Sequence, residues 1–413
     1  MIDESSRKSR YKPEGQPGGA SAGSGRVLAA LIVGQLGMHS VMAGLRMAAP
    51  LQALREGYSA WSVGLLLALF AAAPVLSALH AGRLADRLGY HRPVRLSVAL
   101  TMAGAALAVT STFVQGHLHF AMLCLAAMAT GAGSNTGMLT IQRTAGATAR
   151  DSTERVRVFS WLGVAPSFSN VIGPVAAGFM IDGFGFAAAY LLLLALPLAT
   201  LVSARQVPLQ TLRPPTDDTR GRRAWELLRA PGFKRLLAIN WLLSMCWDVH
   251  IFAVPVLGHE RGFSAGTIGL ILGSFTMSVT LVRLLIPALA HRLDERRVLQ
   301  LAMLGTGLVF ALYPLAPTAG LMAACAGVLG LTLGSVQPMV MSMLHHLTPD
   351  HRHGEALALR SMVMNASSTA MPLVFGATGT LVGAALLFWA VGAAVGSGSW
   401  LVRRLHGTGS LQS

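Results

Sequence analysis

The sequence predicts an all-α integral membrane protein whose twelve transmembrane helices form two pseudo-symmetric six-helix bundles. Three observations lead to this fold class: a strongly apolar composition, apolar runs of membrane-spanning length, and an internal repeat. Of the 413 residues 53% are hydrophobic and only 12% are charged, whereas soluble proteins are about 25% charged. This composition excludes a soluble enzyme and a disordered scaffold.

The apolar runs have the length of membrane helices, because about 20 residues cross a bilayer as a helix. They are rich in Gly, Ala and Ser, which allow membrane helices to approach closely, and they lack the ten-residue alternation of barrel strands. The twelve expected spans are 27–52, 60–81, 94–115, 119–142, 158–181, 186–204, 235–257, 264–289, 297–316, 319–345, 356–382 and 384–402.

The basic residues fall almost entirely on one side of these spans. Of 32 Lys and Arg residues, 27 lie on the side of the N-terminus, two (Arg55 and Arg261) lie on the other, and three lie within spans. The positive-inside rule makes the rich side cytoplasmic, so we expect both termini there. The net charge of +15 then reflects orientation, and no nucleic-acid partner is expected. Because Arg outnumbers Lys 29 to 3, we expect a bacterial inner membrane protein.

An internal repeat divides the chain. Residues 46–70 match 251–275 at an offset of 205, with Pro50 on Pro255 and Gly57 on Gly262. Transporters built from parallel repeats bind substrate between the halves near the midplane. The expected organisation is an N-terminal tail (1–26), a first half (27–204), a central cytoplasmic loop (205–234), a second half (235–404) and a C-terminal tail (405–413).

The segment GRLADRLGYHR at 82–92 resembles the signature Gly-x-Leu-Ala-Asp-Arg-x-Gly-Arg-Lys of the major facilitator superfamily, at the same place between spans two and three. Tyr90 and His91 replace the usual basic pair. The resemblance implies secondary transport by alternating access, and the alternative for this segment is a solvated turn. It also implies a cytoplasmic conformational latch made of Gly82, Asp86, Arg87, Gly89 and Arg92.

Gly173 and Pro174 in span five resemble the Gly-Pro-x-x-Gly-Gly stretch of proton-driven antiporters and are assigned to the same latch. A proline kink with small packing residues explains them equally well. The arginine that many proton antiporters carry in span four is absent, since Ala127 stands there. The resemblance therefore favours antiport without establishing it.

Ionisable residues at membrane depth mark transport pathways, because they are costly in a bilayer. Asp248 lies within span seven, on one stripe with Asn240 and Ser244. In span one Gln35, His39 and Arg46 form a second stripe. We expect both stripes to face a central cavity. Asp248 is either a proton carrier or a structural partner of Arg46 or His39, and Arg46 either binds an anionic group or extends to the outer interface.

Four further residues are candidates for the substrate-binding site. Asn135 and Gln337 make either substrate or helix–helix hydrogen bonds, Asn365 is expected in the cavity, and Trp247 either lines the cavity or packs ordinarily. His345, His346, His351 and His353 lack the spacing of a metal site. No catalytic constellation, cofactor motif or Walker loop is present, so neither an enzyme nor a metal or cofactor is expected.

The expected function is secondary active transport by alternating access. The favoured hypothesis is proton-coupled export of a small organic compound (a drug or metabolite). Two alternatives stay open: proton-coupled uptake of an organic anion, and a transporter-like membrane sensor without net flux. The expected partners are the small-molecule substrate, protons and the lipid bilayer, and the protein is expected to be a monomer.

Overall fold

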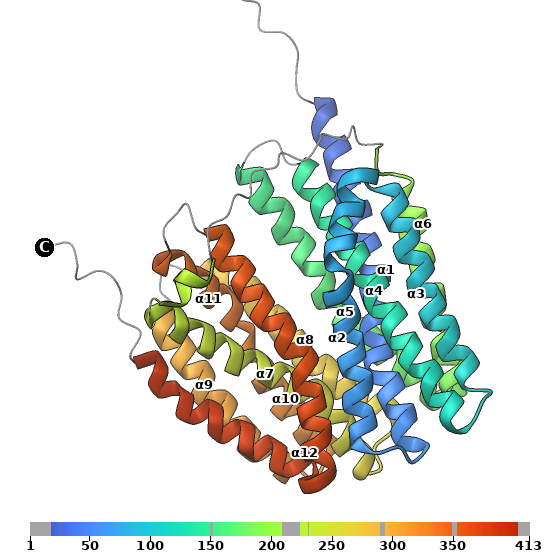
Figure 1. Cartoon of the computed structure of the whole chain (residues 1–413), viewed down its shortest axis with the longest axis vertical. Coiled ribbons are helices and arrows are strands. Elements are labelled where there is room, and N and C mark those ends of the chain that lie inside the picture. Colours follow the sequence, from blue (N-terminus) through green and yellow to red (C-terminus); the bar gives the residue numbers. More distant parts are fainter. Residues whose placement is uncertain are drawn as a thin grey trace, which may run out of the picture.

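A computed structural model describes residues 18–148, 152–208, 224–229, 231–289, 294–348 and 353–403, which are helical apart from short turns (Figure 1). The helices of the first half are α1 (Gly18–Arg55), α2 (Ala60–Leu88), α3 (His91–Ser111), α4 (Gly116–Thr148), α5 (Ser152–Ala195) and α6 (Pro197–Ala204). The rest are η1 (Ala224–Arg229), α7 (Pro231–Glu260), α8 (Ala265–Leu289), α9 (Glu295–Leu312), η3 (Tyr313–Leu315), α10 (Ala319–Gly334), α11 (Val336–Leu347) and α12 (His353–Arg403).

These helices form the twelve expected spans, although their boundaries differ. In the described residues, nine stretches are long and apolar enough to cross a membrane, and one of them, Trp161–Ala204, holds two spans. The remaining two spans are α4 and the first part of α12, which are richer in Gly, Ser, Thr and Asn. Span six continues from α5 into α6, and span ten is divided between α10 and α11.

Two long helices bend at glycines where a span was expected to end. The backbone at Gly185 in α5 has φ 84°, and at Gly383 in α12 it has φ 79°. Both values lie in the left-handed region, which glycine adopts at no steric cost. Each glycine therefore marks the turn between two spans, and the two helices that it joins follow each other along the chain almost without interruption.

The structure extends the internal repeat. Gly57 and Gly262, related by the offset of 205, both have positive φ (85° and 70°). Further along, Pro372, Gly376 and Gly383 follow Pro174, Gly178 and Gly185 at a constant offset of 198. The second half thus repeats the first with seven fewer residues before its fifth helix.

The two halves stand beside each other and converge at the end away from the N-terminus (Figure 1). They meet along two helix pairs, α2 with α12 and α5 with α8. A Cβ on Gly64 of α2 would lie 2.3 Å from the carbonyl oxygen of Pro372, and a Cβ on Gly269 of α8 would lie 2.5 Å from that of Pro174. Because these pairs are equivalent in the repeat, the same backbone contact closes this end twice.

The opposite end is open between α5 and α8. The stripe of α5 that contacts α8 runs through Gly178, Val175 and Val171 and continues, at helical spacing, to Phe168 and Trp161. These two side chains are 42% and 54% exposed. The corresponding stripe of α8 continues past Gly273 to exposed side chains including Met277 and Leu284. The stripes of α5 and α8 therefore pack against each other at the closed end of the molecule and are separated at the opposite end.

The signature segment is mostly helical. Residues 82–88 extend α2 seven residues beyond the expected end of span two, and the turn begins at Gly89, whose φ is 70°. Arg92 lies exposed in the first turn of α3. The side chains of Asp86 and Arg87 and the surroundings of Gly82 lie outside what the structure describes, so the latch stays a prediction.

Candidate substrate and proton site

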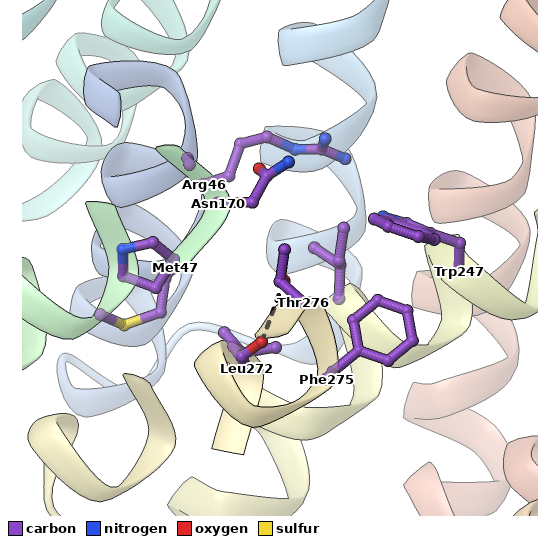
Figure 2. Close-up of a pocket in the computed structure, with 10 residues that line it drawn as sticks. Arg46, Met47, Asn170, Trp247, Leu272, Phe275 and Thr276 are labelled. Carbon is purple, nitrogen blue, oxygen red and sulfur yellow. Dashed lines mark hydrogen bonds between the residues drawn. The ribbon is translucent and has the colours of Figure 1, made fainter. Parts of the chain in front are cut away.

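A small pocket lies between the halves (Figure 2). It is close to the closed end, because Pro174, whose carbonyl oxygen approaches Gly269 there, also lines it. Its volume is about 40 Å³, room for a few water molecules. Four helices from both halves form it, α1, α5, α7 and α8. Its lining residues are Ala43, Arg46, Met47, Asn170, Pro174, Trp247, Ile251, Leu272, Phe275 and Thr276.

Arg46 supplies the positive charge of the pocket. Its side chain extends from α1 over the pocket toward Trp247 (Figure 2). Its Nε atom is buried and has no hydrogen-bond partner among the described residues. A guanidinium group offers a planar fork of donors that matches a carboxylate or phosphate, so the unpaired group is available to an anion.

Asp248 follows Trp247 on α7 but is not among the residues that line the pocket. The residue is only 7% exposed, and its Oδ2 accepts a hydrogen bond of 3.3 Å from Ser368 Oγ on α12. In the described part of the chain no ion pair within 4.0 Å joins it to Arg46, although the two charges influence each other. Asp248 is therefore a buried acid without a bonded cation.

The other residues of the two polar stripes lie along α1 and α7 at different depths, and none of them lines the pocket. His39 is half-buried, and Gln35 is buried with no partner for its Oε1 among the described residues. Asn240 donates to the sulfur of Met364 at 3.0 Å and so joins α7 to α12. Ser244 is half-buried between Asn240 and Asp248. The stripe of α7 therefore faces α12 as well as α1.

One wall of the pocket is aromatic. The rings of Trp247 and Phe275 meet edge to face with their centroids 4.6 Å apart. Thr276 lies beside them and donates to the carbonyl of Leu272 at 3.1 Å, which leaves its oxygen able to accept. Asn170 adds an amide opposite this wall (Figure 2). The pocket thus combines an apolar surface with a few polar groups, as ligand sites do.

Sequence reasoning missed four residues here. Asn170, Phe275 and Thr276 line the pocket, but nothing in the sequence shows where α5 and α8 cross α1 and α7. His250 is fully buried against Phe275, at 4.4 Å between centroids, with no partner for either ring nitrogen in the described residues. The signal for His250 was present, because it is an ionisable residue at membrane depth two positions after Asp248.

Three expected cavity residues lie away from this pocket. Asn135 donates to the carbonyl of Pro74 at 3.5 Å, and Gln337 accepts from Arg283 at 3.0 Å. Both contacts join helices within one half, which fits the helix–helix alternative. Asn365 is exposed on α12.

Gly173 and Pro174 lie at the crossing of α5 with α1 and α8. A Cβ on Gly173 would lie 2.4 Å from the carbonyl oxygen of Ser40 on α1. The Pro174 carbonyl contacts Gly269 on α8, and its ring lines the pocket. The two residues therefore combine close packing with a position at the interface of the halves. In the described residues no three His, Cys, Asp or Glu side chains gather as a metal site.

Comparison with known families agrees with this architecture of two six-helix halves around an interface pocket. The family model of the Major Facilitator Superfamily matches residues 31–246 and 236–409. The chain belongs to the major facilitator superfamily. It is therefore a membrane transporter.

Solved structures share the fold of this superfamily member at low sequence identity. The nucleoside transporter NupG matches with a TM-score of 0.74 and 13% identity, over 91% of this chain and 99% of that one. A POT family transporter in complex with a thioalcohol-conjugated peptide matches with a TM-score of 0.69 and 13% identity, over 91% and 95%. A peptide transporter POT in complex with sulfate gives 0.70 and 13%, over 91% and 93%. At this identity the likeness concerns the fold alone.

Proposed function

We propose that the protein is a proton-coupled symporter of a small organic anion that works by alternating access. One observation carries the proposal: Arg46 lines the interface pocket, the buried acid Asp248 of the other half follows the lining residue Trp247, and no ion pair joins the two charges among the described residues. Arg46 would bind the anionic group of the substrate, and Asp248 would carry the proton.

The charges of the site couple the two ligands. An anion bound by Arg46 lies in the field of Asp248, and like charges repel strongly where water is scarce. Protonation of Asp248 removes this repulsion, so the proton and the anion assist each other's binding. Mutual assistance is the requirement for symport, whereas an antiporter needs its two ligands to compete.

The remaining pocket residues indicate the rest of the substrate. Trp247 and Phe275 present aromatic surface, while Asn170 and Thr276 offer hydrogen bonds. We therefore propose an organic anion with a planar or apolar body and one or two polar substituents. The present volume of about 40 Å³ is too small for such a molecule, so its binding requires the halves to move.

The orientation follows from the distribution of basic residues. With both termini in the cytoplasm of a bacterium and the chain in its inner membrane, the closed end faces the periplasm. The structure then represents an inward-facing state, in which substrate exchanges with the cytoplasm. We propose that the protein acts as a monomer, because one chain contains both halves and so supplies both Arg46 and Asp248.

Proton-driven export remains a second candidate. It draws on the resemblance of Gly173 and Pro174 to the antiporter stretch and on their place at the interface of the halves. The two candidates differ in the direction in which the cargo moves relative to the protons, so the experiment measures this direction.

The test uses the full chain in sealed vesicles with an imposed pH gradient, screened against a panel of small organic anions and cations. The symporter concentrates an anion on the alkaline side. Asp248→Asn abolishes concentrative flux but keeps counterflow, since a neutral side chain still permits exchange of the anion. Arg46→Gln abolishes both. Arg283→Gln, which alters another arginine within the spans but outside the pocket, keeps both.

Three results oppose the proposal. Undiminished concentrative flux in Asp248→Asn excludes this residue as the proton carrier. Accumulation of a panel member on the acidic side, in exchange for protons, supports the exporter instead. Binding of a panel member without counterflow in the parent protein indicates the sensor.

A further inference from the structure

A basic groove lies on the outer face of the first half, far from the substrate pocket. It runs between the start of α3 and the end of α6, which lie side by side in Figure 1. Two adjoining hollows of about 670 Å³ and 460 Å³ share His91, Arg95 and Arg205. Both are larger than the substrate pocket, so the groove accommodates a sizeable ligand without rearrangement.

The upper part of the groove is positively charged. Arg92, Arg95 and Arg205 are all exposed along it. Among the described residues that line the two hollows, none is acidic. The N-terminus of α3, a helix of 21 residues, also begins here and adds the partial positive charge of its dipole. These groups together attract an anion with several acceptor oxygens.

The lower part of the groove is apolar. Val98, Ala99 and Met102 of α3 face Leu201 and Ala204 of α6 across it. The neighbouring side chains Leu96, Leu198 and Val202 are between 45% and 60% exposed, as expected of a surface that contacts lipid. A positive end above an apolar channel matches the two chemistries of a phospholipid, a phosphate headgroup and an acyl chain.

The residues around the groove hold it in shape. The Nε2 atom of His91 lies 3.0 Å from the carbonyl oxygen of Val207, which fixes the segment after α6 against α3. Tyr90 is 1% exposed at the base of the second hollow, and its hydroxyl has no partner in the described residues. Burial raises the pKa of Tyr90 to about 12, so the hydroxyl keeps its proton and does not repel an anion.

We propose that this groove binds an anionic phospholipid, with its phosphate between Arg95 and Arg205 and an acyl chain along Met102 and Leu201. The orientation proposed above places the groove in the cytoplasmic leaflet, where basic pockets between helices recognise such headgroups. The continuous apolar channel favours a lipid over free phosphate.

The test measures lipid binding to the purified full chain by native mass spectrometry. Phosphatidylglycerol and phosphatidylcholine of equal chain length are titrated in separate experiments. The parent protein binds phosphatidylglycerol more tightly. The double variant Arg95→Gln/Arg205→Gln binds it roughly 30-fold more weakly, about fivefold for each arginine, and the charge-retaining variant Arg95→Lys/Arg205→Lys keeps most of the affinity.

The matched control is Arg296→Gln/Arg297→Gln, which removes two exposed arginines from the first turn of α9, the equivalent helix in the other half. It retains parental affinity. Equal loss in this control would show general attraction to a basic face and overturn the proposal. Displacement of phosphatidylglycerol by an excess of inorganic phosphate would also overturn it, because the groove would then bind phosphate without the acyl chain. Folding of each variant is checked by its melting temperature. Neither result depends on flux, so failure here leaves the transport proposal intact.

Discussion

At the scale of single residues, Asp182 shows how the closed end is held. Its two carboxylate oxygens accept hydrogen bonds from the backbone N–H groups of Ala265 and Gly266, at 2.8 and 2.6 Å. Asp182 belongs to α5 and the two donors begin α8, so a residue of one half caps a helix of the other. Acidic caps stabilise helix N-termini through unpaired N–H groups and the helix dipole.

Asp182→Ala removes this cap and favours opening of the closed end. The loss of about 1 kcal/mol raises the population of the state in which this end is open about fivefold. Spin labels at Ser59 and Pro317, two exposed positions on outer turns of the two halves, report the change as longer distances in a cysteine-free background. Asp294→Ala is the control, because Asp294 caps α9 through Arg297 within one half. Unchanged distances in Asp182→Ala would exclude a role in closure.

The geometry of Arg46 makes a second residue-scale prediction. Arg46→Lys keeps the charge but loses the forked donors that bind both oxygens of a carboxylate. We expect counterflow of the anion to need roughly tenfold more substrate in Arg46→Lys, while the dependence on Asp248 stays. Counterflow that is unaffected by the lysine would show that Arg46 acts as a point charge alone.

Sequence reasoning reaches only part of the site at this scale. The cost of burying charge singled out Arg46, which lines the pocket, and Asp248, which is buried beside the lining residue Trp247. The sequence did not reveal the roles of Asn170, Thr276 or the helix cap at Asp182. These contacts depend on where helices far apart in the sequence cross, and apolar helices carry little information about their crossing points.

At the scale of elements, paired glycines decide how closely the halves approach. Ala in place of Gly64 or Gly269 would put a methyl group 2.3 or 2.5 Å from a carbonyl oxygen of the other half. Neither carbonyl is at the end of a flexible side chain, so the helices themselves must separate. The contact tolerates no side chain.

Gly64→Ala and Gly269→Ala are each expected to disfavour the inward-facing state and to slow counterflow several-fold. Gly163→Ala on α5 is the control, since a Cβ there meets no atom within 4 Å. Label distances between Ser59 and Pro317 lengthen in the first two variants and stay unchanged in the third. Equal flux in all three would show that closure of this end tolerates looser packing.

The elements themselves were largely predictable, because length and apolarity determine membrane spans. The details that differ are all at helix ends. Glycines at 185 and 383 allow a turn with almost no interruption of helix, so two expected loops are reduced to kinks. Residues 82–88 continue α2 as a helix to Gly89, although they are too polar for the apolar run to include them.

At the scale of the whole molecule, the repeat was visible in the sequence and its consequence is visible in the structure. The offset of 205 related the beginnings of the halves, while the later offset of 198 emerges where Pro174 and Pro372 occupy equivalent crossings. The conformational state lay beyond the sequence, because the same residues must fit both an inward-facing and an outward-facing arrangement. The boundaries of the two halves within the chain remain a prediction.

The unbonded pair of Arg46 and Asp248 has a consequence for the membrane potential. In the proposed cycle the empty site holds one positive and one negative charge, and the loaded site holds Arg46, a monovalent anion and a neutral acid. Both forms cross the membrane with no net charge. One charge moved through 100 mV corresponds to about 2.3 kcal/mol, so an imposed potassium diffusion potential should leave the initial rate unchanged at a fixed pH gradient. A rate that follows the potential would require a second proton or a different cargo charge.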